Sequence, residues 1–263
     1  MITARFPAAL LFGLSTVSGA LSADRPIAAV ALSGPFATQT PWRLTVMQSG
    51  LPGESRTGDT EPGVVRPCLR HMDSPICDPT LSARLDPNRL RSDFDQPHYL
   101  RTARVAYRQA GDREPVLIVV LASIHAGNGG QLVGTQALAY RRDTDRFVQV
   151  FAQSTGTNNN QEVRFIKAGP LRGAFITVEP TVDAPFSYWV TVARSGGETA
   201  PYHTVLRYRS ATRYGDGNAL PVIDSEMPQI LHGLSLWRPG QKLPLPASGC
   251  PKPILRNGAL WCS

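Results

Sequence analysis

The sequence contains none of the short motifs that mark common enzymes and cofactor sites. It has no G-x-S-x-G, H-E-x-x-H or S-x-x-K motif, no Walker-type loop and no EF-hand loop. No reaction is therefore indicated by a motif, and a protein without an enzymatic role is favoured. We expect no metal and no cofactor.

Lysine is scarce as well. Only Lys167, Lys242 and Lys252 are lysines among the 27 basic residues, and the arginines are spread along the chain. The net charge of +7 is typical of a solvated basic surface, which attracts acidic partners. Because the arginines form no basic tail and the chain begins with an export signal, we expect no nucleic-acid partner.

Long apolar runs are absent beyond the N-terminus. There, Phe6–Val17 follows Arg5 and precedes small residues, which predicts a secretory signal peptide over residues 1–20. Cleavage after Ala20 or after Ser22 fits equally well. The longest later run, Val116–Ile124, is too short for a membrane-spanning helix. The sequence thus predicts a periplasmic or secreted protein with no integral membrane segment once the signal is removed.

Residues 99–220 are predicted to form the strand core of a single β domain over residues 21–263. Its strand-like segments are rich in β-branched and aromatic residues and mostly bounded by turn formers: Tyr99–Ala110, Pro115–Ile124, Gln131–Arg142, Arg146–Gln153, Gln161–Lys167, Leu171–Glu179, Phe186–Arg194 and Tyr202–Arg209. Val116–Leu121 is apolar throughout, which predicts a strand buried on both faces. Short connections without helices predict an all-β fold, mainly an antiparallel meander, built as a barrel, a sandwich or propeller-like blades.

The two ends of the chain are rich in proline. Residues 21–98 are predicted to be an irregular wrap over the sheet, with strands at Ile27–Leu32 and Trp42–Gln48. Residues 221–263 are predicted to hold one short helix near 225–234, where apolar residues recur at helical spacing, followed by an extended tail.

The four cysteines indicate disulfide bonds, as is usual in an exported protein. Proximity in sequence favours the pairs Cys68–Cys77 and Cys250–Cys262. A crossed pairing, which would tie the early segment to the tail, is the alternative. In either case the bonds would fasten segments that have little regular structure.

Three polar, turn-rich patches are candidate sites. The first, Arg207–Glu226, offers groups that suit a bound carboxylate or phosphate: Arg207, Arg209, Arg213, Tyr214 and Asn218. Its acidic residues Asp216, Asp224 and Glu226 are candidates for acid–base work on a glycoside. The alternative interpretation is a turn and a helix cap, with Arg–carboxylate pairs that fasten the loop to the sheet.

The second patch, Ser123–Gly130, carries His125, which is a candidate base near the end of a buried strand. The third patch, Gly156–Glu162, has a run of asparagines that suits a hairpin loop or hydrogen bonds to sugar hydroxyls. A plain glycine connection and a plain hairpin are the corresponding structural interpretations.

Export, cysteines, a β scaffold and missing catalytic motifs together favour an exported, disulfide-containing β protein that acts as a binding, inhibitor or envelope-accessory module. Its partner would be an acidic envelope component or another exported protein. The alternative is an exported hydrolase that acts on glycan or cell-wall material through the carboxylates near 216–226, with His125. Two carboxylates about 5–10 Å apart in a cleft would favour the hydrolase, whereas Arg–carboxylate pairing in that region would favour the first hypothesis.

Overall fold

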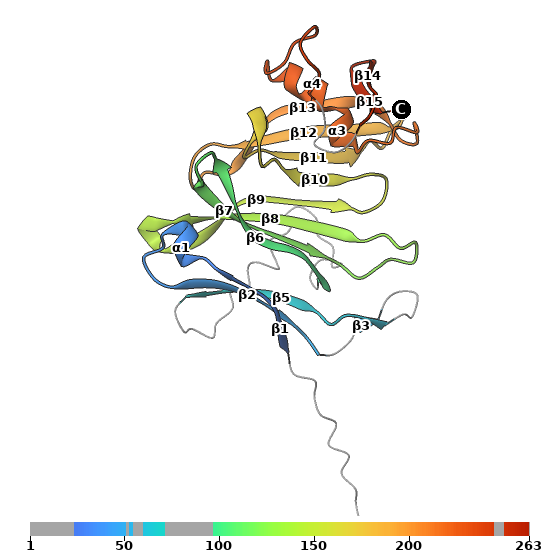
Figure 1. Cartoon of the computed structure of the whole chain (residues 1–263). Coiled ribbons are helices and arrows are strands. Elements are labelled where there is room, and N and C mark those ends of the chain that lie inside the picture. The colour runs from blue at the N-terminus through green and yellow to red at the C-terminus, as the bar shows by residue number, and fades with distance from the viewer. Residues whose placement is uncertain (1–23, 51–52, 55–59, 72–96, 245–249, 263) are drawn as a thin grey trace, which may run out of the picture.

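The computed structural model describes residues 24–50, 53–54, 60–71, 97–244 and 250–262. Three antiparallel sheets follow one another along the chain (Figure 1). The first contains β1 (Arg25–Ala31), β2 (Trp42–Gln48) and β5 (Val65–His71). The second contains β6 (Tyr99–Gln109), β7 (Arg113–Ala122), β8 (Leu132–Arg141) and β9 (Arg146–Gly156). The third contains β10 (Glu162–Phe165), β11 (Phe175–Pro180), β12 (Ser187–Ser195) and β13 (Tyr202–Arg213).

The remaining elements are short. Two hairpins pair β3 (Gly53–Glu54) with β4 (Thr60–Glu61), and β14 (Pro253–Arg256) with β15 (Ala259–Cys262). The helical elements are α1 (Ser33–Phe36), η1 (Arg142–Thr144), η2 (Gly169–Leu171), α3 (Val222–Ser225) and α4 (Met227–Gly233). The predicted all-β antiparallel meander is confirmed, and within the described residues no sheet closes into a barrel. No helix in this part of the chain has the length and apolar character needed to cross a bilayer.

The second sheet has a hydrophobic core on each face, as predicted for its central strand. Leu117 and Val119 of β7 pack in one buried cluster with Leu44 of the first sheet. The intervening Ile118 packs in another cluster with Phe175 of the third sheet. Because successive side chains of a strand point to opposite faces, one uniformly apolar strand serves both cores. Each such side chain stabilises the fold by about 1.5–3 kcal/mol when fully buried.

A third core lies on the outer face of the third sheet. Val190 and Val192 of β12 are buried there with Ile223 and Ile230 from the helical segment. That segment contains two short helices where one was predicted. Pro228 sits in the first turn of α4, and a proline cannot donate to the carbonyl four residues earlier and clashes with it. A continuous helix from residue 222 is therefore excluded.

The N-terminal segment differs from the predicted irregular wrap, since its described part forms a regular sheet. The predicted strands correspond to β1 and β2, but β5 was missed because it contains Pro67. In the strand order β1-β2-β5 the proline lies on an edge strand, where a missing N–H breaks no inner ladder.

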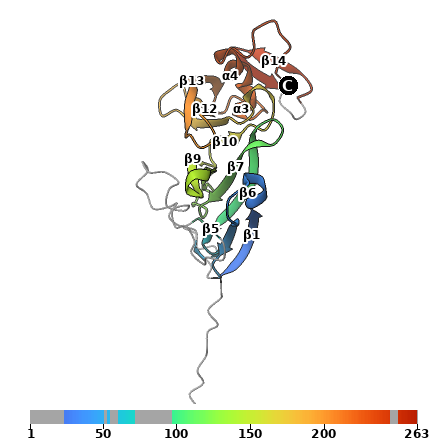
Figure 2. The same ribbon diagram turned by 90° about the vertical axis from the view of Figure 1, so that its left-hand side faces the viewer.

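The C-terminal segment also differs from the predicted extended tail, because it folds back as the β14–β15 hairpin. Asn257 and Gly258 form its turn with φ of 50° and 86°, the left-handed conformations that a tight hairpin requires. The predicted Cys250–Cys262 disulfide is confirmed, with the Cα atoms 5.4 Å apart, so the crossed pairing is wrong. Cys68 is disulfide-bonded, but its expected partner Cys77 lies outside the described residues, and that pairing stays a prediction. Figure 2 shows this hairpin with α3 and α4 at one end of the molecule and the first sheet towards the other.

Candidate functional site

The second and third predicted patches lie together at one end of the second sheet. The register pairs Leu132, two residues after one patch ends, with Gly156, where the other begins. The backbone N–H of Thr157 donates to the carbonyl of Gln131 at 2.8 Å, and the backbone N–H of Gln131 donates to the Thr157 hydroxyl at 2.8 Å. Gly130 approaches Asn158 so closely that a Cβ there would lie 2.5 Å from its side-chain oxygen.

The first patch leaves the third sheet at the corresponding end. There Arg213, the last residue of β13, pairs with Ser187, the first residue of β12. The buried Tyr188 hydroxyl lies near Asn160 of the third patch and near Asp216 and Tyr214 of the first, but it has no hydrogen-bond partner among the described residues. Burial is the main cause that raises the pKa of Tyr188. Patches that are far apart in the sequence thus meet at one end of two sheets.

Arg209 holds a loop rather than facing an open site. Its Nε donates to the Ser187 hydroxyl at 2.8 Å, and its Nη1 lies 3.1 Å from a carboxylate oxygen of Asp183. Its Nη2 donates to the carbonyls of Asp183, at 2.9 Å, and Pro185. The loop between β11 and β12 is therefore fixed by one side chain. Tyr214, beside it, is exposed.

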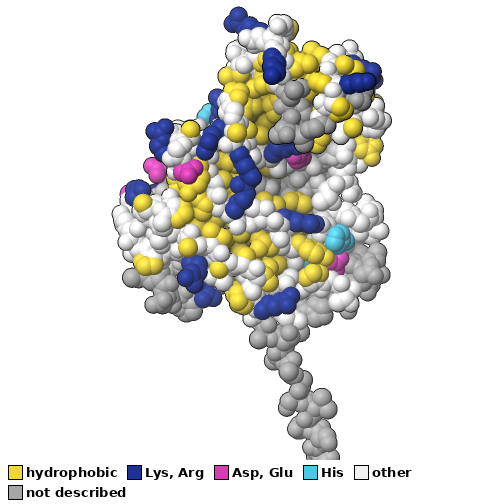
Figure 3. Space-filling view, viewed as in Figure 1, with side chains coloured by type: hydrophobic (Ala, Val, Ile, Leu, Met, Phe, Trp, Pro, Cys, Tyr) yellow, Lys and Arg dark blue, Asp and Glu magenta, His cyan; other side chains and the backbone are white. Residues whose placement is uncertain are grey.

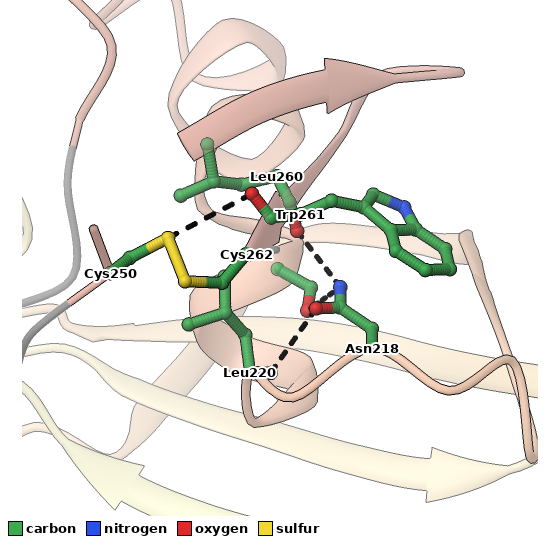
Figure 4. The surroundings of a disulfide bond; sticks show 7 residues. Asn218, Leu220, Cys250, Leu260, Trp261 and Cys262 are labelled. Atoms are coloured by element: carbon green, nitrogen blue, oxygen red, sulfur yellow. Dashed lines mark hydrogen bonds between the residues drawn. A yellow bond between two sulfur atoms is a disulfide. The ribbon is translucent and has the colours of Figure 1, made fainter. Parts of the chain in front are cut away.

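The turn after β13 is built by Asp216 and Asn218. Asp216 accepts the backbone N–H of Arg213 at 3.1 Å and that of Asn218 at 2.9 Å, the pattern of a side-chain-stabilised turn. The Asn218 side chain donates to the Leu260 carbonyl and to the Ser225 hydroxyl, both at 2.9 Å (Figure 4). Asn218 thereby fastens the disulfide-closed hairpin to the sheet.

The other two carboxylates of the first patch, Asp224 and Glu226, accept hydrogen bonds from neighbouring residues. Asp224 accepts a hydrogen bond from Arg164 Nη1 at 2.6 Å. The same guanidinium donates from Nε to Glu162, the last residue of the third patch, at 2.5 Å. Burial alone would lower the pKa of Arg164, but the hydrogen bonds to Asp224 and Glu162 outweigh it and raise the pKa. This pairing agrees with the alternative interpretation of the first patch, in which Arg–carboxylate pairs fasten the loop to the sheet.

Glu226 is fully buried. Its carboxylate accepts the Tyr208 hydroxyl at 3.0 Å and, on its other oxygen, the backbone N–H of Thr212 at 2.9 Å and the Thr212 hydroxyl at 2.5 Å. Burial first, and then the charge of Glu226, raise the pKa of Tyr208. Glycoside hydrolysis by the carboxylates near 216–226 stays a prediction, and their contacts do not favour it.

A cleft of about 250 Å³ lies between β9 and the face of the third sheet that is turned towards it. Its wall on β9 includes Phe151 and Gln153, and threonines dominate the opposite wall. The lining residues are Val150, Phe151, Ala152, Gln153, Thr177, Glu179, Thr191, Ala193, Tyr202 and Thr204. Gln153 Nε2 donates to a carboxylate oxygen of Glu179 at 3.1 Å. The cleft therefore combines hydroxyl, amide and carboxylate groups with aromatic rings, and no sequence motif predicts it.

Arg207 lies on the same sheet face as the cleft. It pairs directly with Thr191, a lining residue, and its guanidinium carbon stands 4.8 Å from the centre of the Trp189 ring. The side chain is exposed, and among the described residues no carboxylate is within ion-pair distance of it. Among the predicted binding residues, Arg207 therefore stands beside the cleft, and its charge forms no ion pair with a described carboxylate.

Glu61 of β4 forms a separate cluster with His125 and Tyr99. His125 Nδ1 lies 2.9 Å from Oε1 of Glu61, and the Tyr99 hydroxyl donates to Oε2. Burial would raise the pKa of Glu61, but the hydrogen bonds from Tyr99 and His125 outweigh it and lower the pKa. Burial and the Glu61 carboxylate raise the pKa of Tyr99 to about 12. The sequence singled out His125 but not Glu61, which lies 64 residues earlier.

Comparison with known proteins gives no relative. No family model, no curated protein and no solved structure matches this chain. Within the described residues there is also no group of three or more His, Cys, Asp or Glu side chains arranged to hold a metal ion.

Proposed function

We propose that this chain is an exported binding protein that takes a carboxylate-bearing glycan of the cell envelope into the cleft between β9 and the third sheet. The observation that carries the proposal is the position of Arg207. An exposed guanidinium without an acidic partner lies beside a polar cleft, and its planar fork matches a carboxylate.

The cleft lining suits a sugar. The hydroxyls of Thr177, Thr191 and Thr204 both donate and accept hydrogen bonds, as sugar hydroxyls require. They stand on neighbouring strands of one sheet, so little conformational entropy is lost when a ligand orders them. Phe151 on the other wall stacks on Phe175 and gives the cleft an apolar side that suits the carbon-bound hydrogens of a sugar.

The surroundings suit an acidic partner. Basic side chains are prominent on the face drawn in Figure 3, while acidic ones are few. A positive surface raises the association rate of an anionic ligand. The N-terminal signal and the cysteines remain the basis for placing the protein in the periplasm or outside the cell.

The test is calorimetric titration with an oligogalacturonate and with an uncharged oligosaccharide of the same length. The wild-type chain should bind the acidic oligomer more tightly. Arg207→Gln should weaken that binding by about 10–100-fold, because a charge-assisted hydrogen bond contributes about 1.5–3 kcal/mol.

Arg256→Gln is the matched control, because Arg256 also stands over a tryptophan, 4.9 Å from the centre of the Trp261 ring, on the C-terminal hairpin. It should bind like the wild type. Equal affinities of the two variants, or no binding of acidic glycans by the wild type, would refute the proposal. New reducing ends in the same mixtures would instead support the hydrolase hypothesis.

A further inference from the structure

Glu61 and His125 form a carboxylate–imidazole pair with a defined orientation. Both the ring Nδ1 and the backbone N–H of His125 contact Oε1 of Glu61, at 2.9 and 3.3 Å. The Glu61 side chain is only 6% exposed, whereas that of His125 is 40% exposed. A buried carboxylate therefore fixes a histidine whose ring reaches solvent.

This orientation determines which ring nitrogen is available. The carboxylate accepts from the Tyr99 hydroxyl and from His125, and these hydrogen bonds stabilise its ionised form. An ionised carboxylate needs a donor at Nδ1, so the ring proton stays there. In the neutral imidazole the lone pair is then on Nε2, at the far end of the ring from the main chain.

A cation lies beside Tyr99, the tyrosine of this cluster. Arg101 is two residues beyond Tyr99 on β6, and its guanidinium carbon is 5.6 Å from the centre of the Tyr99 ring, against which His125 also packs. Arg101 donates to the side-chain oxygen of Gln131, and Gln131 Nε2 donates to the Ser123 carbonyl at 2.7 Å. Arg101 is thereby linked to the loop that carries His125.

We propose that His125 is a general base for the hydrolysis of a small acyl ester, with Glu61 as the residue that positions it. Nε2 takes a proton from water as the water oxygen bonds to the acyl carbon and the carbonyl π electrons move to the carbonyl oxygen. Arg101 attracts the negative charge formed there. The bond to the alcohol oxygen then breaks, and this oxygen takes the proton from Nε2, which yields one carboxylic acid and one alcohol. The activity is separate from glycan binding at the cleft.

His71 of β5 provides a matched control, because its side chain is 41% exposed and also contacts a carboxylate, that of Asp145, at 3.2 Å. It does so through Nε2, which leaves only Nδ1, next to its own main chain. Hydrolysis of 4-nitrophenyl acetate by the full chain, measured above buffer, should fall about 100-fold in His125→Ala, as expected for loss of a general base. It should stay unchanged in His71→Ala.

Two further measurements separate catalysis from a structural role. Free imidazole, after subtraction of its own rate, should restore hydrolysis by His125→Ala but add nothing to His71→Ala. Arg101→Gln, at an exposed position, should lower kcat about 10-fold or more with little change in KM. Equal rates for wild type and folded His125→Ala would overturn the proposal. If His125→Ala does not fold, the proposal would be overturned by an unchanged rate in Arg101→Gln. Absence of hydrolysis by the wild type would also overturn it.

Discussion

Two carboxylates stand at opposite ends of the second sheet, each beside a tyrosine and a half-exposed histidine. Asp145 is the last residue of the β8–β9 turn. It accepts hydrogen bonds from Tyr140 at 2.5 Å, Thr40 at 2.5 Å, Trp42 Nε1 at 3.0 Å and His71 at 3.2 Å. These donors come from both the first and the second sheet. Burial would raise the pKa of Asp145, but their hydrogen bonds outweigh it and lower the pKa to about 2.

The Glu61 cluster has similar side chains but a different outcome. In the Asp145 cluster His71 contacts the carboxylate through Nε2, the nitrogen farther from the main chain. Its ring packs on Trp42, with 4.9 Å between the ring centres. In the Glu61 cluster His125 contacts the carboxylate through the inner nitrogen, Nδ1, and its side chain is 40% exposed. The same residue types therefore fasten two sheets together or present a base, according to which ring nitrogen contacts the carboxylate.

The largest effect on stability is expected for Asp145→Ala. It leaves the hydroxyls of Tyr140 and Thr40 and the Trp42 N–H without their acceptor, and unsatisfied buried donors cost about 1–3 kcal/mol each. We expect a loss of about 3 kcal/mol in the free energy of unfolding, measured in urea. Asp143→Ala, in the same turn but exposed, should lose less than about 0.5 kcal/mol. Equal losses would show that Asp145 does not join the sheets.

Glu61→Gln should cost less. The amide keeps one oxygen that accepts from His125, and only the charge-assisted part of two hydrogen bonds is lost, so we expect about 1–2 kcal/mol. Its effect on ester hydrolysis should be larger than its effect on folding, because a neutral amide no longer stabilises the imidazolium that forms when Nε2 takes the proton. If Glu61→Gln lost as much stability as Asp145→Ala and hydrolysis were unchanged, the Glu61 cluster would serve only to stabilise the fold, as the Asp145 cluster does.

A third effect is confined to acid. Since folding lowers the pKa of Asp145 from 3.8 to about 2, its ionised form stabilises the protein above pH 3.8, and this contribution is lost as the pH falls towards 2. Thermal unfolding between pH 5 and 2 should therefore show a steeper decline for wild type than for Asp145→Asn. Parallel declines would mean that other acids dominate.

The predictable parts of the fold are those with a strong local pattern. The uniform apolar run of β7 indicated two buried faces, and the spacing of Ile230 and Leu231 indicated a helix. Pro67 concealed β5, because an edge position cannot be recognised without knowing the strand order. The Asn257-Gly258 turn was recognisable in principle, but the surrounding prolines favoured an extended tail.

The candidate sites were predictable only in part. Polar loops were found because glycine and asparagine mark turns, and Arg207 was named although its place beside the cleft was not foreseen. The pairing of Glu61 with His125 joins residues 64 positions apart and follows no motif. Threonines such as Thr191 line the cleft because strands pair in register, and register is a property of the folded chain.

The alternating side chains of β7 have a consequence for how the molecule denatures. Leu117 belongs to the core shared with the first sheet, and Ile118 to the core shared with the third. If either neighbouring sheet unfolded, one face of β7 would be exposed to water, although its opposite face would still belong to the core of the remaining sheet. The sheets therefore should melt in a single cooperative transition, with amide hydrogens in all three exchanging at a common slowest rate.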